Sequence, residues 1–287
     1  MRIALTYNLK RTESEREAEF DSPATIHTLT RELAALGHDV TPIDVTGSIA
    51  WLVTRLRRAA PDVVFNLAEG EHGTFREAFY PALFEQLGLR HTGSPASALA
   101  LCLDKVIAKR IVAAAGVRVP NDRGRRVIVK PRFEGSSKGI AQASVTRDPA
   151  PLLARARYPM MVEAYVDGDD ASVAWVDGLG FTAITYAYAP TGPHRILDFE
   201  LKQAPDRVAS RVVHDARLVD AARRAFAALG VEGYGRADFR VTPDAVYFLE
   251  MNPIPSMAPA DGELYEGRTI AATLAAIVGR EALTRCA

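Results

Sequence analysis

The sequence has few cysteines, no excess of either charge and no long apolar run, and each absence excludes a class of protein. Two cysteines, Cys102 and Cys286, are too few for a disulfide framework or a cysteine-based zinc site, and they fit a reducing cytoplasm. The 35 basic residues balance the 35 acidic ones. We therefore expect neither a general nucleic-acid binder nor a binder of anionic membranes. No run of about 18 apolar residues occurs, so no transmembrane helix is expected.

Two common nucleotide-binding patterns are also missing. No G-x-G-x-x-G segment follows the first predicted strand, at residues 2–7, which argues against a nicotinamide-dependent dehydrogenase. The G-x-x-x-x-G-K-[ST] spacing of a Walker loop does not occur either. We interpret residues 2–7 as a buried strand, and not as a signal peptide, because they lack a long apolar region.

The first third of the chain alternates between apolar strands and amphipathic helices. Hydrophobic residues make up 48% of the chain, which is enough for large cores. The alternation predicts an α/β domain with a doubly wound parallel sheet. Ligands of such sheets bind beyond the carboxyl ends of the strands, so the loops at 8–21 and 66–76 are candidate site segments. We expect strands at 2–7, 38–44 and 62–67, and helices at 22–36, 51–58 and 77–87.

The segment Tyr234–Met257 reads as two strands joined by a polar turn. Arg236 and Asp238 alternate with apolar residues, and Glu250 and Asn252 lie two apart on the second strand. Side chains two apart on a strand point to the same face, so a hairpin would bring Asp238, Glu250 and Asn252 together. Three converging oxygen ligands suit Mg²⁺ bound together with substrate phosphates. A hairpin with a solvated polar face is the alternative.

Upstream lysines and a Gly/Ser-rich segment predict a phosphate site. Lys105 lies at a helix start, where a cation is disfavoured, and Lys130 ends a β-branched strand at 126–131. The sequence Glu-Gly-Ser-Ser-Lys-Gly at 134–139 leads to a second strand candidate at 140–145. Two strands joined by such a loop predict a flap whose backbone N–H groups and serine hydroxyls bind phosphate oxygens. A solvated lysine and an ordinary turn are the alternatives.

Glu163 interrupts an apolar strand at 160–166. A purine needs hydrogen-bond partners and apolar walls, which Glu163 and the backbone of 164–166 can supply. The alternative is a strand with one edge carboxylate. Antiparallel strands at 172–176 and 181–188, a polar loop at 189–210, a helix at 215–229 and a C-terminal helix at 267–279 complete the prediction.

Together these segments resemble the ATP-grasp superfamily and, within it, the D-alanine–D-alanine ligases. No single match decides this, but their order and spacing do. The matching segments are Glu15-Arg-Glu17, Gly73-Thr74, His91-Thr-Gly-Ser94, Asp104-Lys105, Val127-Ile-Val-Lys-Pro131, Glu134-Gly-Ser-Ser137 with Gly139, Glu163, Gly233-Tyr-Gly-Arg-Ala-Asp238 and Leu249-Glu-Met-Asn252.

The resemblance implies an α/β ATP-grasp fold in which ATP lies between an α+β lid and an antiparallel-sheet catalytic domain. It also implies a small amino-acid-like substrate and a homodimer, and no nucleic-acid or membrane partner. The implied parts are an N-terminal α/β domain at 1–95, a helical linker at 96–125, the lid at 126–175 and the catalytic domain at 176–287.

The resemblance further implies roles for individual residues. Two Mg²⁺ ions, for which Mn²⁺ can substitute, would be held by Asp238, Glu250 and Asn252. The catalytic residues would be Arg236, Lys202 and Ser136. ATP would be bound by Lys105, Lys130, Glu134, Ser136, Ser137, Glu163, Tyr165, Val166, Asp170 and Lys202. Candidate substrate contacts are Glu17, Glu19, Ser22, Glu69, Gln203, Ser256 and Asp261.

The substrate-binding segments depart from the family's pattern. Lys202-Gln203 replaces the family's Lys-Tyr pair, and Ala68-Glu69-Gly70-Glu71 replaces its His-Gly segment. Pro253–Gly262 places Asp261 where the family binds the carboxylate of the acceptor, which Asp261 would repel. These acidic residues suggest a cationic or amine-bearing substrate, and solvated loop residues are the alternative.

We therefore expect an ADP-forming ligase that joins a carboxylate to an amine through an acyl phosphate. Its substrate would be a small amino acid or related metabolite of specialised metabolism, joined to a second molecule or cyclised. A D-alanine–D-alanine ligase of cell-wall synthesis is the alternative within the family. A nucleotide-binding pseudoenzyme is the alternative from another class.

Overall fold

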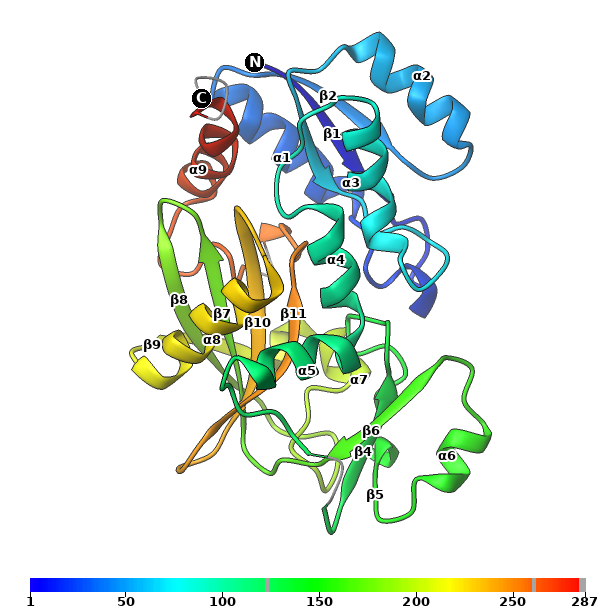
Figure 1. Cartoon of the computed structure of the whole chain (residues 1–287), viewed down its shortest axis with the longest axis vertical. Coiled ribbons are helices and arrows are strands. Elements are labelled where there is room, and N and C mark those ends of the chain that lie inside the picture. Colours follow the sequence, from blue (N-terminus) through cyan, green and yellow to red (C-terminus); the bar gives the residue numbers. More distant parts are fainter. Residues whose placement is uncertain (122–123, 260–261, 284–287) are drawn as a thin grey trace.

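The computed structural model describes residues 1–121, 124–259 and 262–283 (Figure 1). Its N-terminal part is a parallel sheet in the order β2-β1-β3 with helices packed against it. Ser22 caps the first helix because its Oγ accepts a hydrogen bond from the N–H of Thr25 at 3.1 Å. The elements are β1 (Arg2–Tyr7), η1 (Glu15–Glu17), α1 (Pro23–Ala35), β2 (Asp39–Asp44), α2 (Ile49–Ala59), β3 (Val63–Leu67) and α3 (Arg76–Gln86).

Two consecutive helices, α4 (Ala96–Leu103) and α5 (Lys105–Ala114), lead from this part to the rest of the chain. Asp104 caps α5, accepting hydrogen bonds from the N–H groups of Val106 at 3.1 Å and Ile107 at 3.2 Å. Lys105 therefore occupies the first position of α5, as the sequence predicted.

The lid is a three-stranded sheet in the order β5-β4-β6. The strand expected at 140–145 is wrong, because β5 comprises Val145 and Thr146 alone. Ser136 and Ser137 have φ values of 48° and 55°, and left-handed residues turn the chain away from an extended ladder. The flap is therefore a long loop that joins β4 to the short strand β5, and these two strands pair antiparallel as the two-stranded prediction required. The lid elements are β4 (Val127–Pro131), η2 (Gln142–Ser144), β5 (Val145–Thr146), α6 (Ala150–Ala154) and β6 (Met160–Ala164).

The largest sheet is antiparallel and has the order β11-β10-β7-β8-β9 (Figure 1). Residues 169–175, which we expected in the lid, belong to β7 and pair with β10. Because β7 is the central strand of the five-stranded sheet, the lid ends before residue 169. The elements are β7 (Asp169–Val176), β8 (Gly180–Ala187), α7 (Phe199–Lys202), η3 (Pro205–Arg207), β9 (Ala209–Val213), α8 (Ala216–Leu229), β10 (Tyr234–Val241), β11 (Val246–Asn252) and α9 (Ile270–Leu283).

Helix α9 returns to the N-terminal part and lies beside α1 (Figure 1). Leu274, Ile277 and Val278 of α9 share one buried apolar cluster with Leu29 and Leu33 of α1. This packing joins α9 to the N-terminal part of the chain, and the expected catalytic domain at 176–287 stays a prediction. No helix in the described part of the chain is long and apolar enough to cross a membrane.

Candidate functional site

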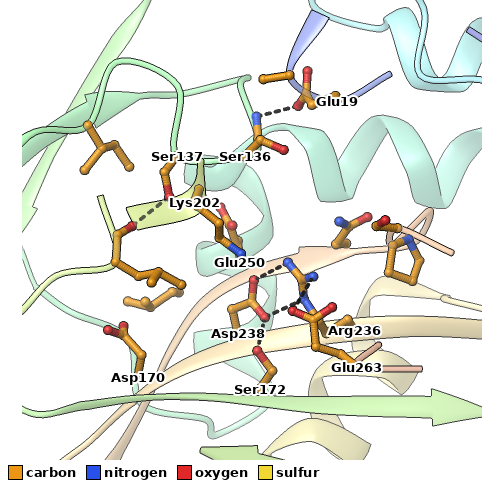
Figure 2. Close-up of a pocket in the computed structure, with 18 of the residues that line it drawn as sticks. Glu19, Ser136, Ser137, Asp170, Ser172, Lys202, Arg236, Asp238, Glu250 and Glu263 are labelled. Atoms are coloured by element: carbon orange, nitrogen blue, oxygen red, sulfur yellow. Dashed lines mark hydrogen bonds and ion pairs between the residues drawn. The ribbon is translucent and has the colours of Figure 1, made fainter. Parts of the chain in front are cut away.

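A cavity of about 760 Å³ is lined by the lid, the five-stranded sheet, α5 and the loop that precedes α1. It brings together most of the residues that the sequence singled out, and Figure 2 shows part of its wall. The predicted site residues on the wall are Glu19, Ser22, Glu69, Lys105, Lys130, Glu134, Ser136, Ser137, Glu163, Tyr165, Val166, Asp170, Lys202, Gln203, Arg236, Asp238, Glu250, Asn252 and Ser256.

Two of the predicted site residues are not among the described residues that line the cavity. Glu17 is half-buried and accepts hydrogen bonds from the backbone N–H groups of Arg11 and Thr12, each at 2.7 Å. It therefore shapes the loop before α1 and is not among the residues that line the cavity, and its assignment as a substrate contact stays a prediction. Asp261 lies outside the described residues.

The β10–β11 hairpin has the geometry that the sequence predicted. Asp238 stands opposite Glu250, and Arg236 stands opposite Asn252. A bulge after Asp238 shifts the register, so the alternation holds up to Asp238 and is broken beyond it. The three oxygen-bearing side chains therefore share one face of the sheet and all line the cavity.

Glu250 is held as a carboxylate by nearby cations. The Nζ of Lys105 lies 3.1 Å from Glu250 Oε2. Burial by itself would raise the pKa of Glu250, but Lys105 and Lys130 lower this pKa to about 2. Two carboxylates and an amide oxygen on one face are ligands that fit a hard cation such as Mg²⁺.

Arg236 is held between two carboxylates (Figure 2). Its Nε and Nη2 donate to the two oxygens of Asp238 at 2.8 and 2.9 Å. Its Nη1 lies 3.3 Å from Oε1 of Glu263. Asp238 also accepts a hydrogen bond from the hydroxyl of Ser172 at 2.6 Å. The position of the guanidinium is therefore defined from both sides.

A buried trio of charges lies where the lid meets α5. Lys130 Nζ is 2.7 Å from Glu163 Oε1, and Lys109 pairs with the other oxygen of Glu163. All three side chains are buried. Burial lowers the pKa of Lys109 to about 7, whereas the two lysines outweigh burial and lower the pKa of Glu163.

Sequence reasoning missed Lys109. It follows Lys105 by one helical turn, and this i,i+4 spacing on α5 was the available signal. Because Lys109 and Lys130 engage both oxygens of Glu163, the contact of Glu163 with an adenine amino group stays a prediction.

The flap is anchored to the loop before α1 through a second carboxylate, Glu19. Its Oε1 accepts the N–H of Gly135 at 2.6 Å, and its carboxylate also pairs with Lys138. Arg76, at the start of α3, donates to both oxygens of Glu19 at 3.0 Å. Sequence reasoning missed Arg76 and Lys138, because nothing local in the sequence shows that α3 and the flap meet at Glu19.

Three carboxylates converge at this anchor. Oxygens of Glu19, Glu69 and Glu77 all lie within 4.8 Å of one another. Arg76 balances part of their charge, with Nη2 3.7 Å from Glu77 Oε1. Burial, together with the charge of Glu19, raises the pKa of Glu77 to about 7, and burial with Glu77 raises the pKa of Glu69 well above its ordinary value.

Asp170 and Lys202 line other parts of the cavity. Asp170 Oδ1 is 2.7 Å from Arg240 Nη1, and Tyr188 donates its hydroxyl proton to the other oxygen. The expected contact of Asp170 with a ribose stays a prediction. Lys202, the last residue of α7, has no ion pair within the described part of the chain.

Comparisons with known proteins show which family this chain resembles. The family model described as "D-ala D-ala ligase C-terminus" matches residues 114–261. The D-alanine–D-alanine ligase of Anaeromyxobacter sp. is 33% identical over 276 residues, which cover 85% of this chain and 84% of the relative. The D-alanine–D-alanine ligase of Gluconobacter oxydans is 34% identical over 249 residues, covering 78% and 80%.

Solved structures show the same fold. The D-alanine–D-alanine ligase of Bacillus anthracis complexed with ATP aligns with a TM-score of 0.75 and 19% identity, over 99% of this chain and 98% of that one. The VanG D-Ala:D-Ser ligase of Enterococcus faecalis aligns with a TM-score of 0.66 and 19% identity, over 97% and 98%. The expected ATP-grasp fold class is thereby confirmed.

Proposed function

This chain belongs to the D-alanine–D-alanine ligase family, and from this premise we propose that it activates the carboxylate of D-alanine, or of a closely related amino acid, for attack by an amine. The protein is an ADP-forming ATP-grasp ligase that makes C–N bonds. The relatives' names favour D-alanine as donor over the specialised metabolite that the altered substrate segments led us to put first. They also make a second D-alanine the first acceptor to test.

One observation carries the proposal. Within a single cavity, the cations Lys105 and Lys130 approach the paired carboxylates Asp238 and Glu250 from the opposite wall. Cations suited to a triphosphate thus meet oxygen ligands suited to the metal that accompanies it. A β10–β11 hairpin with only a structural role would not need lysines and carboxylates to meet in one cavity.

The proposed first step transfers the terminal phosphoryl group. A carboxylate oxygen of the donor attacks the γ-phosphorus, the bond from that phosphorus to the bridging oxygen breaks, and ADP leaves with the electron pair. Lys105, Lys130 and Lys202 are proposed to bind the phosphates, with Ser136 and Ser137 of the flap covering them. Asp238, Glu250 and Asn252 would hold Mg²⁺, which offsets the negative charge of the triphosphate.

The proposed second step forms the amide. A neutral amine attacks the acyl carbon of the acyl phosphate, the C–O bond to phosphate breaks, and the proton lost from nitrogen leaves with the phosphate. Arg236, held by Asp238 and Glu263, would stabilise the oxyanion of the tetrahedral intermediate. The flap, anchored at Glu19, would exclude water that hydrolyses the acyl phosphate.

Hydroxylamine trapping tests this function without depending on the natural acceptor. The protein is incubated with ATP, Mg²⁺, hydroxylamine and a panel of D- and L-amino acids, and ADP and acyl hydroxamates are measured. We expect D-alanine to give D-alanyl hydroxamate and ADP well above the reaction without donor. If ATP binds but no amino acid raises ADP or hydroxamate, the chain is a nucleotide-binding pseudoenzyme and the ligase proposal fails.

A further inference from the structure

Lys109 is a buried lysine that the proposed function does not use. It lies on α5 one turn after Lys105, and its ammonium group pairs with Oε2 of Glu163 on β6. Lys130, on β4, pairs with the other oxygen of Glu163 at 2.7 Å. One lysine would balance the charge of this carboxylate, so the second adds a cation beyond what neutrality requires.

Glu163 borders on two cavities. It lines the cavity of about 760 Å³ that contains the candidate site, and a smaller one of about 300 Å³ between α5 and β6. Among the described residues, Lys109 lines the smaller cavity and not the larger one, whereas Lys130 lines the larger one. A ligand in the larger cavity would therefore meet Glu163 and Lys130, with Lys109 on the far side of the carboxylate.

Lys130 is shared between Glu163 and the phosphates that the proposed function assigns to it. Burial by itself would lower the pKa of Lys130, but the charges of Glu163 and Glu250 outweigh burial and raise this pKa. A buried carboxylate that lost its only cation would be strongly unfavourable. Because Lys109 stays paired with Glu163, Lys130 can turn to a phosphate without leaving that carboxylate unpaired.

The surroundings of Glu163 suit a base with an amino group. Glu163 stands opposite Ile128 in the β4–β6 ladder, and both line the larger cavity, where apolar walls fit a flat ring. A carboxylate offers about four lone-pair sites, and the two lysines take one on each oxygen. An ionised carboxylate only accepts hydrogen bonds, so it favours an amino group and disfavours a carbonyl oxygen at the same position.

We propose that Lys109 is a positioning residue of the nucleotide site. It holds Glu163 ionised and in place, so that Glu163 accepts a hydrogen bond from the adenine amino group while Lys130 binds phosphate. The inference rests on the proposed function and assigns its preference for adenine over a base with a carbonyl at that position. Burial lowers the pKa of Lys109 to about 7, and the neutral amine still carries N–H groups that donate to Glu163.

Nucleotide affinity tests the inference without depending on catalysis. Isothermal titration calorimetry in the presence of Mg²⁺ measures the Kd of ATP and of inosine triphosphate, which has a carbonyl in place of the adenine amino group. The wild-type protein should bind ATP about tenfold or more tightly than inosine triphosphate, because the second nucleotide loses a hydrogen bond to a charged group. Lys109→Met should reduce this ratio to about threefold or less and weaken ATP binding about tenfold.

Kinetics and matched variants separate positioning from a purely structural effect. In the hydroxylamine assay with D-alanine, Lys109→Met should raise the KM for ATP about tenfold and keep kcat at saturating ATP within about threefold. Lys109→Arg keeps a cation and should retain most of the preference for ATP. Arg110→Gln removes an exposed cation from the next position of α5 and should change neither the Kd ratio nor the KM. Lys109→Gln, a second variant for use if Lys109→Met does not fold, should also lower the ratio.

The outcomes are distinct. A wild-type protein that binds both nucleotides equally, or a Lys109→Met variant with the wild-type ratio, overturns the inference. A kcat that falls at unchanged KM overturns it as well, because that result assigns Lys109 to the chemical step. If the nucleotide preference responds as expected but hydroxylamine trapping fails, the ligase proposal is wrong and the assignment of Lys109 stands.

Discussion

The ammonium group of Lys105 lies 3.1 Å from the carboxylate of Glu250, and this contact joins the first turn of α5 to β11. A lysine at a helix start is unfavourable by itself. Here the Asp104 cap and Glu250 offset that cost, and Lys105 also donates to the carbonyl oxygen of Glu134 in the flap at 2.6 Å. One lysine thus connects α5, the hairpin and the lid.

Replacing Glu250 should abolish turnover without unfolding the protein. Glu250→Gln removes a proposed metal ligand, so donor-dependent ADP formation should fall by about 100-fold or more. Lys105 is buried, but it keeps its hydrogen bond to the carbonyl oxygen of Glu134, and glutamine still offers an amide oxygen, so the loss of unfolding free energy should be about 1–3 kcal/mol. Asp244→Asn, which changes an exposed carboxylate in the β10–β11 turn, is the matched control. ADP formation that survives in Glu250→Gln would remove Glu250 from the metal site.

The buried trio at Glu163 should respond unequally to removal of its members. Glu163→Leu leaves the ammonium groups of Lys109 and Lys130 without a carboxylate, and should lower the unfolding free energy by about 3–5 kcal/mol. Lys109→Met leaves the pair of Glu163 with Lys130 intact and should cost clearly less. Urea denaturation of the two variants measures the difference, and equal losses would show that Lys109 and Lys130 do not share Glu163.

Glu77 should make stability fall with rising pH. Its pKa is about 7 in the folded protein and 4.5 ordinarily, so between these values the folded state binds more protons than the unfolded chain. The unfolding free energy should therefore decrease from about pH 4.5 to about pH 7, by at most about 3 kcal/mol, and this loss persists above pH 7.

Glu77→Gln should reduce this pH dependence, and Glu69, whose pKa is also raised, should supply the slope that remains. The variant should be more stable than the wild type at pH 8 and similar to it near pH 4.5. Glu13→Gln, which changes an exposed carboxylate, serves as the control and should keep the slope. Thermal unfolding measured across this pH range tests the prediction. If the variant keeps the full pH dependence of the unfolding free energy, Glu77 is not its source.

Gly168 should not tolerate a side chain, although its backbone is not left-handed. A Cβ at Gly168 would lie 2.3 Å from the carbonyl oxygen of Val241, a backbone atom that cannot turn aside. Gly168→Ala should destabilise the protein by about 1–3 kcal/mol. Gly279, inside α9, has no atom near its Cβ position, and Gly279→Ala should stabilise the helix by about 0.5–1 kcal/mol. Comparison of their melting temperatures tests both expectations.

The sequence predicted those features that depend on local periodicity. Alternation along β10 and β11 placed Asp238, Glu250 and Asn252 on one face, and Ser22 and Gly230 marked the ends of helices that the structure contains. The second strand of the flap was mispredicted at 140–145 because the left-handed φ values of Ser136 and Ser137, which lengthen the loop, are not visible in residue type.

What the sequence by itself determined is the set of chemical groups and the faces on which short-range periodicity places them, because the helix and strand repeats act over a few residues. The tertiary structure alone decided which charges meet. Lys109 and Glu163 are 54 residues apart in the chain, and Glu263 reaches Arg236 through the segment that follows β11. Such partners depend on how whole elements pack, and that packing determines which cations of the cavity remain available to a substrate.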